Sequence, residues 1–549
     1  MNPYCQTKAD YFWLTKTIIM NVIKIASYSL LLSLMVPSLH AQGTSYTAKK
    51  GKLTEDQLKR WSHLDLSKDS IPGMSVDRVY AELTKNKKSK KVIVGVVDSG
   101  VDIDHEDLKS VVWTNKKEIA GNGVDDDKNG FVDDIHGWNF LGDSGNENLE
   151  MTRILKKADD GSPEYKVAKA EYDRMYQENL QGKQQVDFIF KANQDIKDYL
   201  KKENYTLEEL KAIQSTDALL GRSRQVMISV IGQAGPDFNE SLISYKDQVY
   251  DMLNYNLNKD FDGRKILGDN PDDMVNTHYG NNTVYGPDKK DALHGTHVAG
   301  IIAQSRNNNL GGDGIADNVE IMAVRAVPNG DEYDKDIALS IRYAVDNGAK
   351  VINGSFGKSF SPHRQWVYDA IKYAEKKDVL IIHAAGNDAK DIDVESNFPN
   401  DSDDKKTEFA DNVITVGALS FDYGEKVIAP FSNYGKFNVD VYAPGMEIYA
   451  TTPNNTYKYE QGTSMASPNV AGVAALIRSY FPNLTAKQVK YILLNSGTPI
   501  DSKVAVGGDS KDLRSFTDLS KSGKIVNAYN AFKMAEKMSP KPKGKKVRG

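Results

Sequence analysis

Short runs of consecutive apolar residues recur along the chain and predict buried β-strands. The first run, residues 92–97, is almost uniformly apolar and ends on Asp98. Such runs are typical of parallel strands that are covered on both faces of a sheet. Further buried strands are predicted at residues 319–327, 350–353, 380–387, 412–418 and 439–443.

Helical patterns alternate with these runs in the second half of the chain. Small apolar residues predominate at 470–477, and amphipathic spacing marks residues 336–347, 487–495 and 524–538. Small residues allow a helix to pack closely against a sheet. The alternation predicts an α/β fold with a doubly wound, mostly parallel β-sheet and helices on both faces.

The stretch from about residue 145 to residue 285 departs from this alternation. Residues 164–180, 186–202 and 207–220 are charged and amphipathic, which is typical of surface helices. A structureless loop of this length would be improbable inside a compact domain, so we expect a helical insertion. The pattern fits either a neutral surface elaboration or a functional lid.

The N-terminus has the composition of an export signal. Residues 22–36 are largely apolar, Lys24 precedes the centre of that run, and cleavage is expected after Ala41. The charged leader would begin at Met20 if translation starts there. The run is too short and too interrupted to predict a membrane span. We therefore expect an exported protein, periplasmic or extracellular, with no stable membrane span after signal removal.

The only cysteine, Cys5, lies within this removable region, so the mature chain is expected to lack disulfides. Residues 42–90 are expected to form a polar N-terminal extension, and residues 91–538 the main domain. The proline- and lysine-rich tail, residues 539–549, is expected to be disordered.

Charge argues against one class of partner. The 70 Lys and Arg residues nearly balance 75 Asp and Glu residues, and the only basic block is the C-terminal tail. Nucleic acid is therefore not an expected partner. The oligomeric state does not follow from the sequence.

Three polar residues stand at positions where a catalytic site is expected. Asp98 ends a strand, His294 opens a helix in the motif His-Gly-Thr-His, and Ser464 follows a glycine at a helix start. Separately they could be a turn former, a helix residue and a helix cap. Together they supply the acceptor, base and nucleophile of an acyl-transfer triad.

These motifs resemble those of the subtilisin-like serine peptidases, the subtilases. The resemblance implies a serine endopeptidase that acts on peptides or proteins without an organic cofactor, with Asp98, His294 and Ser464 as its triad. It further implies that Asn387 stabilises the oxyanion. Binding of substrate as an added strand implies broad specificity. The substrate-binding strand would comprise Ser355, Phe356 and Gly357.

Two stretches are candidate calcium sites. The loop at 122–134 places oxygen ligands at Asp125, Asp127 and Asn129, although His136 stands where an EF-hand has its closing glutamate. A solvated acidic turn is the alternative. By resemblance to the subtilases, Asp107 and Asn308 would bind a second structural calcium ion.

Two alternatives to a subtilisin-like peptidase are an α/β-hydrolase and a binding protein. An α/β-hydrolase requires a histidine after the serine, and no histidine follows Ser464. A different class of protein is a catalytically weak binding protein with the subtilase fold, which would use its helical insertion to recruit a partner. The region before Asp98 is short for the folded propeptide that many subtilases carry.

Overall fold

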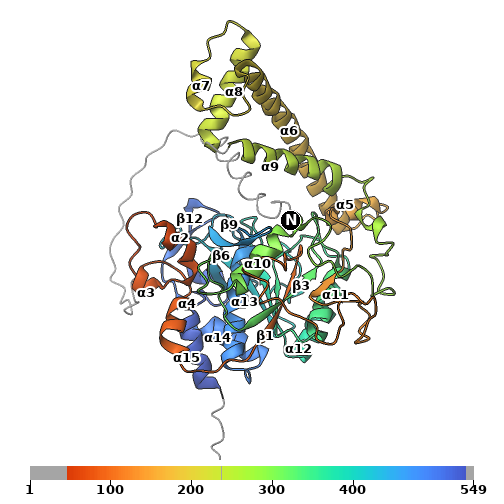
Figure 1. Ribbon diagram of the computed structural model, residues 1–549, viewed down its shortest axis with the longest axis vertical. Coiled ribbons are helices and arrows are strands. Elements are labelled where there is room, and N and C mark those ends of the chain that lie inside the picture. The colour runs from red at the N-terminus through yellow and green to blue at the C-terminus, as the bar shows by residue number, and fades with distance from the viewer. Residues whose placement is uncertain (1–45, 236–237, 540–549) are drawn as a thin grey trace, which may run out of the picture. The chain divides into compact units, whose positions relative to one another are not determined.

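The computed structural model describes residues 46–235 and 238–539 (Figure 1). The chain divides into two compact units. Among the described residues, the first comprises 46–145, 264–328 and 332–539, and the second comprises 146–235, 238–263 and 329–331. The expected signal, Cys5 and all but the first residue of the basic tail lie outside the described residues.

The first unit is built on a nine-stranded sheet with the order β10-β13-β7-β6-β5-β4-β1-β3-β2. All neighbouring strands are parallel except the pair β10 and β13, which is antiparallel. The strands are β1 Val92–Asp98, β2 Gly137–Asn139, β3 Val319–Arg325, β4 Val351–Gly354, β5 Leu380–Ala384, β6 Val413–Leu419, β7 Val441–Pro444, β10 Thr498–Pro499 and β13 Lys524–Ile525. The predicted mostly parallel sheet is confirmed.

Helices cover both faces of this sheet. Ile321 and Ala323 of β3 belong to one apolar cluster, and the intervening Met322 and Val324 belong to another. Because alternate residues of a strand point to opposite faces, the two clusters lie on opposite sides of the sheet. The first cluster includes residues of α10 Leu293–Ala303, α13 Thr463–Tyr480, α14 Ala486–Ser496 and α15 Ala528–Met538, and the second residues of α11 Asp334–Asp346 and α12 Arg364–Lys376.

The segment expected to be a polar N-terminal extension contributes to the core of the first unit. Trp61, Ile71 and Met74 are buried in the first cluster, and Trp61 Nε1 donates to the carbonyl oxygen of Met446. The segment contains α2 Glu55–Arg60, η1 Trp61–His63, α3 Leu66–Asp69, α4 Val76–Arg78 and η2 Val79–Leu83. The remaining elements of this unit are η4 Gly263–Ile266, η5 Lys289–Ala292, η6 Phe516–Asp518 and the hairpins β8 Ile448–Thr452 with β9 Thr456–Glu460 and β11 Lys503–Val506 with β12 Asp509–Ser515.

The second unit is helical in its described residues, and its longest helix is α6, Pro163–Leu200. Ser162 caps this helix, and Pro163 at its first position is compatible with a helix start. The other elements are α5 Glu150–Lys156, α7 Leu207–Ala212, α8 Ala218–Ala234, α9 Phe238–Asp251 and η3 Met252–Asn256. Leu210, Met227 and Phe238 lie in a separate apolar core.

The predicted helix boundaries in this unit were partly wrong. Residues 181–185 continue α6. A Cβ on Gly182 would lie 3.1 Å from Tyr245 and 3.4 Å from Val249 on α9. The glycine permits close helix packing and does not end the helix. Conversely, residues 207–220 form parts of two helices, since Asp217 caps a new helix, α8.

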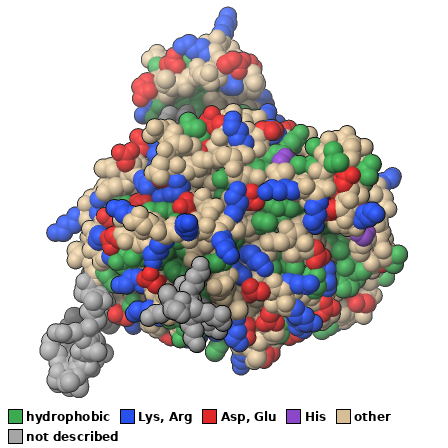
Figure 2. All heavy atoms as spheres, turned by 60° about the horizontal axis from the view of Figure 1, so that its bottom comes forward, with side chains coloured by type: hydrophobic (Ala, Val, Ile, Leu, Met, Phe, Trp, Pro, Cys, Tyr) green, Lys and Arg blue, Asp and Glu red, His purple; other side chains and the backbone are tan. Residues whose placement is uncertain are grey.

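Two surface properties bear on partners. On the face seen in Figure 2, basic and acidic side chains are interspersed. Within the described residues, no helix has both the length and the hydropathy that crossing a bilayer requires.

Candidate active site

The candidate catalytic residues gather where the central parallel strands end. Asp98 is the last residue of β1, Ser355 directly follows β4, and Asn387 follows β5 by three residues. Val97 pairs with Gly354, so Asp98 and Ser355 lie on neighbouring strand ends. Parallel neighbours bring their carboxyl ends to one edge, where α/β sheets bind ligands.

Asp98 and His294 form a direct buried pair. His294 Nδ1 lies 2.6 Å from Asp98 Oδ1, and each side chain is only 1% exposed. The same carboxylate oxygen accepts the backbone N–H of Ser99 over 2.7 Å. With Nδ1–H donating to Asp98, Nε2 is the unprotonated nitrogen of the neutral ring, which can accept a proton. This nitrogen is buried and has no hydrogen-bond partner among the described residues.

Ser464 is the second residue of α13 and is bonded to the end of β4. Its hydroxyl donates to the carbonyl oxygen of Ser355 over 3.2 Å, and the hydroxyl of Ser355 donates to the carbonyl oxygen of Ser464 over 2.9 Å. The expected hydrogen bond between Ser464 and His294 is therefore not formed between these two described side chains. Rotation about one side-chain bond redirects the Ser464 hydroxyl, and such bonds often form only when substrate is bound.

Two N–H donors face one small space beside Ser464. Asn387 Oδ1 accepts the backbone N–H of Thr463 over 2.8 Å and its hydroxyl over 2.9 Å, which fixes the orientation of the amide. A Cβ atom on Gly462 would lie 3.3 Å from Asn387 Nδ2 and 3.5 Å from the backbone nitrogen of Ser464. The Ser464 N–H has no intrahelical acceptor, because it lies in the first turn of α13. Both donors are thus available to an oxyanion, in a space that remains open because residue 462 is glycine.

The residues after β4 that are predicted to bind substrate are closely packed. Phe356 is 6% exposed and its ring lies 6.0 Å from that of His383. A Cβ on Gly357 would lie 3.0 Å from Asn397 Oδ1, and Lys358 forms an antiparallel bridge with Phe398. Burial lowers the pKa of His383 to about 4, so this ring stays neutral against the carbonyl oxygen of Gly354.

The comparison with known families decides the identity of this arrangement. The family model described as the subtilase family matches residues 89–518. The chain belongs to the subtilase family. Subtilisin DY from Bacillus licheniformis is 36% identical over 215 residues, which are 39% of this chain and 73% of that protein.

Other relatives match this subtilase over smaller shares of their length. The thermophilic serine proteinase of Bacillus sp. (strain AK1) is 45% identical over 187 residues, 34% of this chain and 42% of the relative. Subtilisin-like protease 1 of Plasmodium vivax is 30% identical over 320 residues, 55% of this chain and 49% of the relative. The chain thus spans less than half the length of these curated relatives. A solved structure of proteases from Pseudoalteromonas arctica PAMC 21717 is 21% identical, with a TM-score of 0.45, covering 87% of this chain and 97% of that one.

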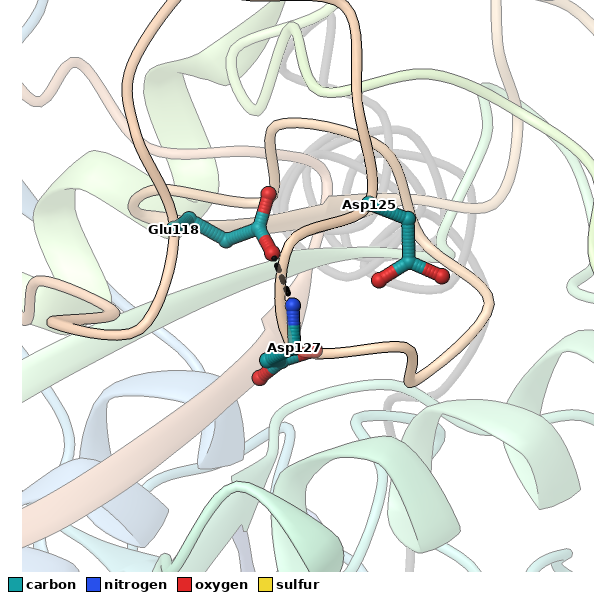
Figure 3. Close-up of side chains that lie close together, drawn as sticks. All are labelled: Glu118, Asp125 and Asp127. Atoms are coloured by element: carbon teal, nitrogen blue, oxygen red, sulfur yellow. Dashed lines mark hydrogen bonds between the residues drawn. The ribbon is translucent and has the colours of Figure 1, made fainter.

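The first candidate cation site of this subtilase lies in its acidic loop. Carboxylate oxygens of Glu118, Asp125 and Asp127 all lie within 4.8 Å of one another (Figure 3). An oxygen donor set of this kind suits calcium. Asn129 takes a different position: its amide nitrogen donates to Asp134 Oδ2, and its oxygen accepts the N–H of Phe131.

Glu118 was not among the residues predicted to bind a metal. It precedes Asp125 by seven residues and therefore falls outside the acidic motif. In the structure the Glu118 side chain lies against the acidic loop. Its carboxylate accepts the N–H of Asp127 over 3.0 Å and that of Asp133 over 3.1 Å. A glutamate shortly before an acidic loop was the only sequence signal available.

The second candidate cation site brings Asp107 and Asn308 together. Asp107 Oδ1 accepts the Asn308 amide over 2.6 Å and the backbone N–H of Ser305 over 3.1 Å. The other oxygen, Oδ2, is buried without a hydrogen-bond partner among the described residues. Burial raises the pKa of this carboxyl. A cation would compensate a buried carboxylate oxygen, so Asp107 fits a calcium ion. The amide oxygen of Asn308 accepts the N–H of Leu310, so Asn308 would have to turn to become a ligand.

Proposed function

We propose that this subtilase is a serine-type endopeptidase that cleaves peptide bonds through an acyl-enzyme on Ser464. The observation that carries the proposal is the buried contact between His294 and Asp98 at the sheet edge to which Ser464 is also bonded. Family membership supports the same activity.

The arrangement supports a sequence of proton transfers. His294 Nε2 accepts the hydroxyl proton of Ser464 as Oγ attacks the scissile carbonyl carbon. The carbonyl oxygen becomes an oxyanion, which accepts hydrogen bonds from Asn387 Nδ2 and from the Ser464 backbone N–H. His294 then returns the proton to the departing amine. A water molecule repeats the cycle on the ester and releases the acid and the free serine.

Substrates of this endopeptidase would be extended peptides or unfolded proteins. Ser355 to Gly357 continue from β4 toward Ser464, where a peptide backbone can pair as an added strand. Such pairing recognises the backbone, so we infer broad specificity. Residues 1–41 have the pattern of an export signal, and we infer a periplasmic or extracellular location.

We further propose that calcium stabilises the folded chain. Glu118, Asp125 and Asp127 would hold one ion, and Asp107 with Asn308 a second. The buried, unpartnered Oδ2 of Asp107 supports the second site most directly. No reaction step requires these ions, which would act on stability alone.

Labelling with a fluorophosphonate tests the endopeptidase directly, because this probe reacts with activated serines. The wild type should be labelled and should hydrolyse casein, whereas Ser464→Ala should do neither. The absence of labelling in a folded wild type would overturn the proposal. It would favour the alternative, a catalytically weak binding protein with the subtilase fold.

A further inference from the structure

Arg325 is a buried cation at the end of β3, in register with the candidate catalytic Asp98 on β1. Its side chain is 2% exposed, and no carboxylate of the described residues lies within ion-pair distance of it. Burial lowers the pKa of its guanidinium to about 10. A buried charge without an ionic partner is costly, so its neutral hydrogen-bond partners must stabilise it.

The guanidinium donates four hydrogen bonds, all to neutral oxygens. Nε donates to the carbonyl of Ser99 over 3.2 Å, and Nη2 to that of Ser144 over 2.7 Å. Nη1 donates to Asn139 Oδ1 and to the carbonyl of Gly142, each over 3.0 Å. A planar fork of five N–H groups can join several segments in this way, whereas a lysine ammonium has only three donors around one point.

We propose that Arg325 is a positioning residue for Asp98, a role that rests on the endopeptidase activity proposed above. Arg325 Nε donates to the carbonyl oxygen of Ser99, and the backbone N–H of Ser99 donates to Asp98 Oδ1. That oxygen in turn accepts from His294 Nδ1. A continuous series of bonds thus leads from the guanidinium, through the Ser99 residue, to the candidate base.

The backbone after Arg325 acts on the same turn. The N–H groups of Ala326 and Val327 both donate to the carbonyl of Asp98, over 2.9 Å and 3.2 Å. Asp98 and Ser99 are therefore held by three consecutive residues of one chain segment. Of these contacts, only the one made by Arg325 comes from a side chain.

The other contacts of Arg325 hold the segments that flank the helical insertion in the sequence. Gly142 and Ser144 immediately precede it, and Asn139 also donates to the carbonyl of Thr283 on the returning segment. A Cβ on Gly286 would lie 2.6 Å from Arg325 Nε, so this backbone rests against the guanidinium. One side chain thereby keeps both segments in fixed positions next to the Asp98 turn.

Arg325→Lys tests the role, with Arg478→Lys as a matched control. Arg478 is also buried, at 4% exposure, and its partners are the carbonyl of Lys350 and the carboxylate of Asp378. It lies fourteen residues beyond Ser464 on α13. The measurements are Tm, kcat and KM on a small chromogenic peptide, and the pH profile of kcat/KM.

Arg325→Lys should lower kcat by about 10- to 100-fold, the effect of a misplaced catalytic group, while KM changes by less than about 2-fold. The acidic limb of the pH profile should move to lower pH, because a displaced carboxylate stabilises the imidazolium less. Arg478→Lys should lower Tm but keep kcat and the pH profile. A wild-type kcat and pH profile in Arg325→Lys would overturn the proposal.

A second variant, Gly286→Ala, tests the proposal independently if Arg325→Lys does not fold. Gly286→Ala retains the arginine but displaces Nε, and it should give the same fall in kcat with little change in KM. If both Arg325→Lys and Gly286→Ala fail to fold, Arg325 is a stability residue and the proposal is wrong. An inactive wild type would instead contradict the endopeptidase itself.

Discussion

The hydroxyl of Ser464 donates to the carbonyl oxygen of Ser355 over 3.2 Å, while Nε2 of His294 stays without a hydrogen-bond partner among the described residues. The proton that His294 must accept thus belongs to a hydroxyl directed at a neighbouring strand end. Activation therefore requires the hydroxyl to turn toward His294, and the position of the imidazole ring becomes decisive. That position depends on Asp98.

Asp98→Asn should lower kcat by about 10⁴-fold, because the amide no longer fixes the required tautomer of His294. The measurement is kcat on a chromogenic peptide. Asp102→Asn is the control, since Asp102 is similarly buried but accepts from the backbone of Asn454 and pairs with Lys289. Equal losses in both variants would contradict a specific role for Asp98.

Asn387→Ala should lower kcat with little change in KM, because its amide would bind the oxyanion and not the ground-state carbonyl. The loss of transition-state stabilisation should be about 2.7–4 kcal/mol, a value known for the removal of an oxyanion donor in another subtilase. Tm should be recorded as well, since Asn387 Oδ1 also accepts two bonds from Thr463. A change confined to KM would argue against the oxyanion role.

Gly462→Ala should abolish most activity even though no catalytic side chain is altered. The new Cβ would lie 3.3 Å from Asn387 Nδ2 and occupy the space between the two donors, and the φ of 147° disfavours any side chain. Gly232→Ala on α8 is the control, because nothing lies within 4 Å of a Cβ there. Comparable labelling of Gly462→Ala and wild type by a fluorophosphonate would disprove this account.

Chelation should lower Tm if calcium binds the folded chain, because a ligand of the native state alone stabilises it. Asp107→Asn should lower Tm in calcium. In a chelator it should be neutral or stabilising, since burial raises the pKa of this carboxyl. Glu118→Gln should lower Tm more in calcium than in a chelator, where it still loses one of the two backbone N–H bonds that the carboxylate accepts. Identical melting of wild type with and without chelator would refute both sites.

Stability should depend on pH through Asp401, which is 8% exposed and 3.8 Å from Lys490 Nζ. Burial raises the pKa of Asp401 to about 7, from 3.8 in the unfolded chain. A raised native pKa gives a stabilising contribution that is complete below pH 3.8 and is lost as pH rises toward 7. Wild type should lose this contribution as Asp401 ionises, whereas Asp401→Asn should not. The Tm of Asp401→Asn minus the Tm of wild type should therefore become larger between pH 5 and about pH 8. A constant difference would show that Asp401 is ionised throughout.

The sheet and the candidate triad followed from the sequence because both depend on local patterns. Strands buried on both faces are uniformly apolar, as in β1, and the candidate residues stand at the ends of such runs or at helix starts. Contacts between residues that are far apart in the sequence leave no local pattern of this kind. Arg325 ends an ordinary strand, and only the fold brings Ser99 and Ser144 to its guanidinium.

The hairpin of β8 and β9 was not predicted, because β9 is mostly exposed or half-exposed and has no apolar run. The continuous helix through Gly182 was not predicted for a similar reason. Its packing depends on Tyr245 and Val249 of α9, which are more than sixty residues later in the chain. Sequence patterns therefore located the main elements and the candidate site residues, whereas close packing and contacts between distant residues required the structure.

The burial of Trp61 limits how this chain can be processed. A cut between Met74 and Leu83 would separate Trp61, Ile71 and Met74 from the protein whose interior they fill. Deleting one large buried side chain alone costs about 3–5 kcal/mol, a large part of the stability of a typical domain. Trimming that leaves the folded domain intact should therefore stop upstream of Trp61, and the first residue of the processed chain should be found there.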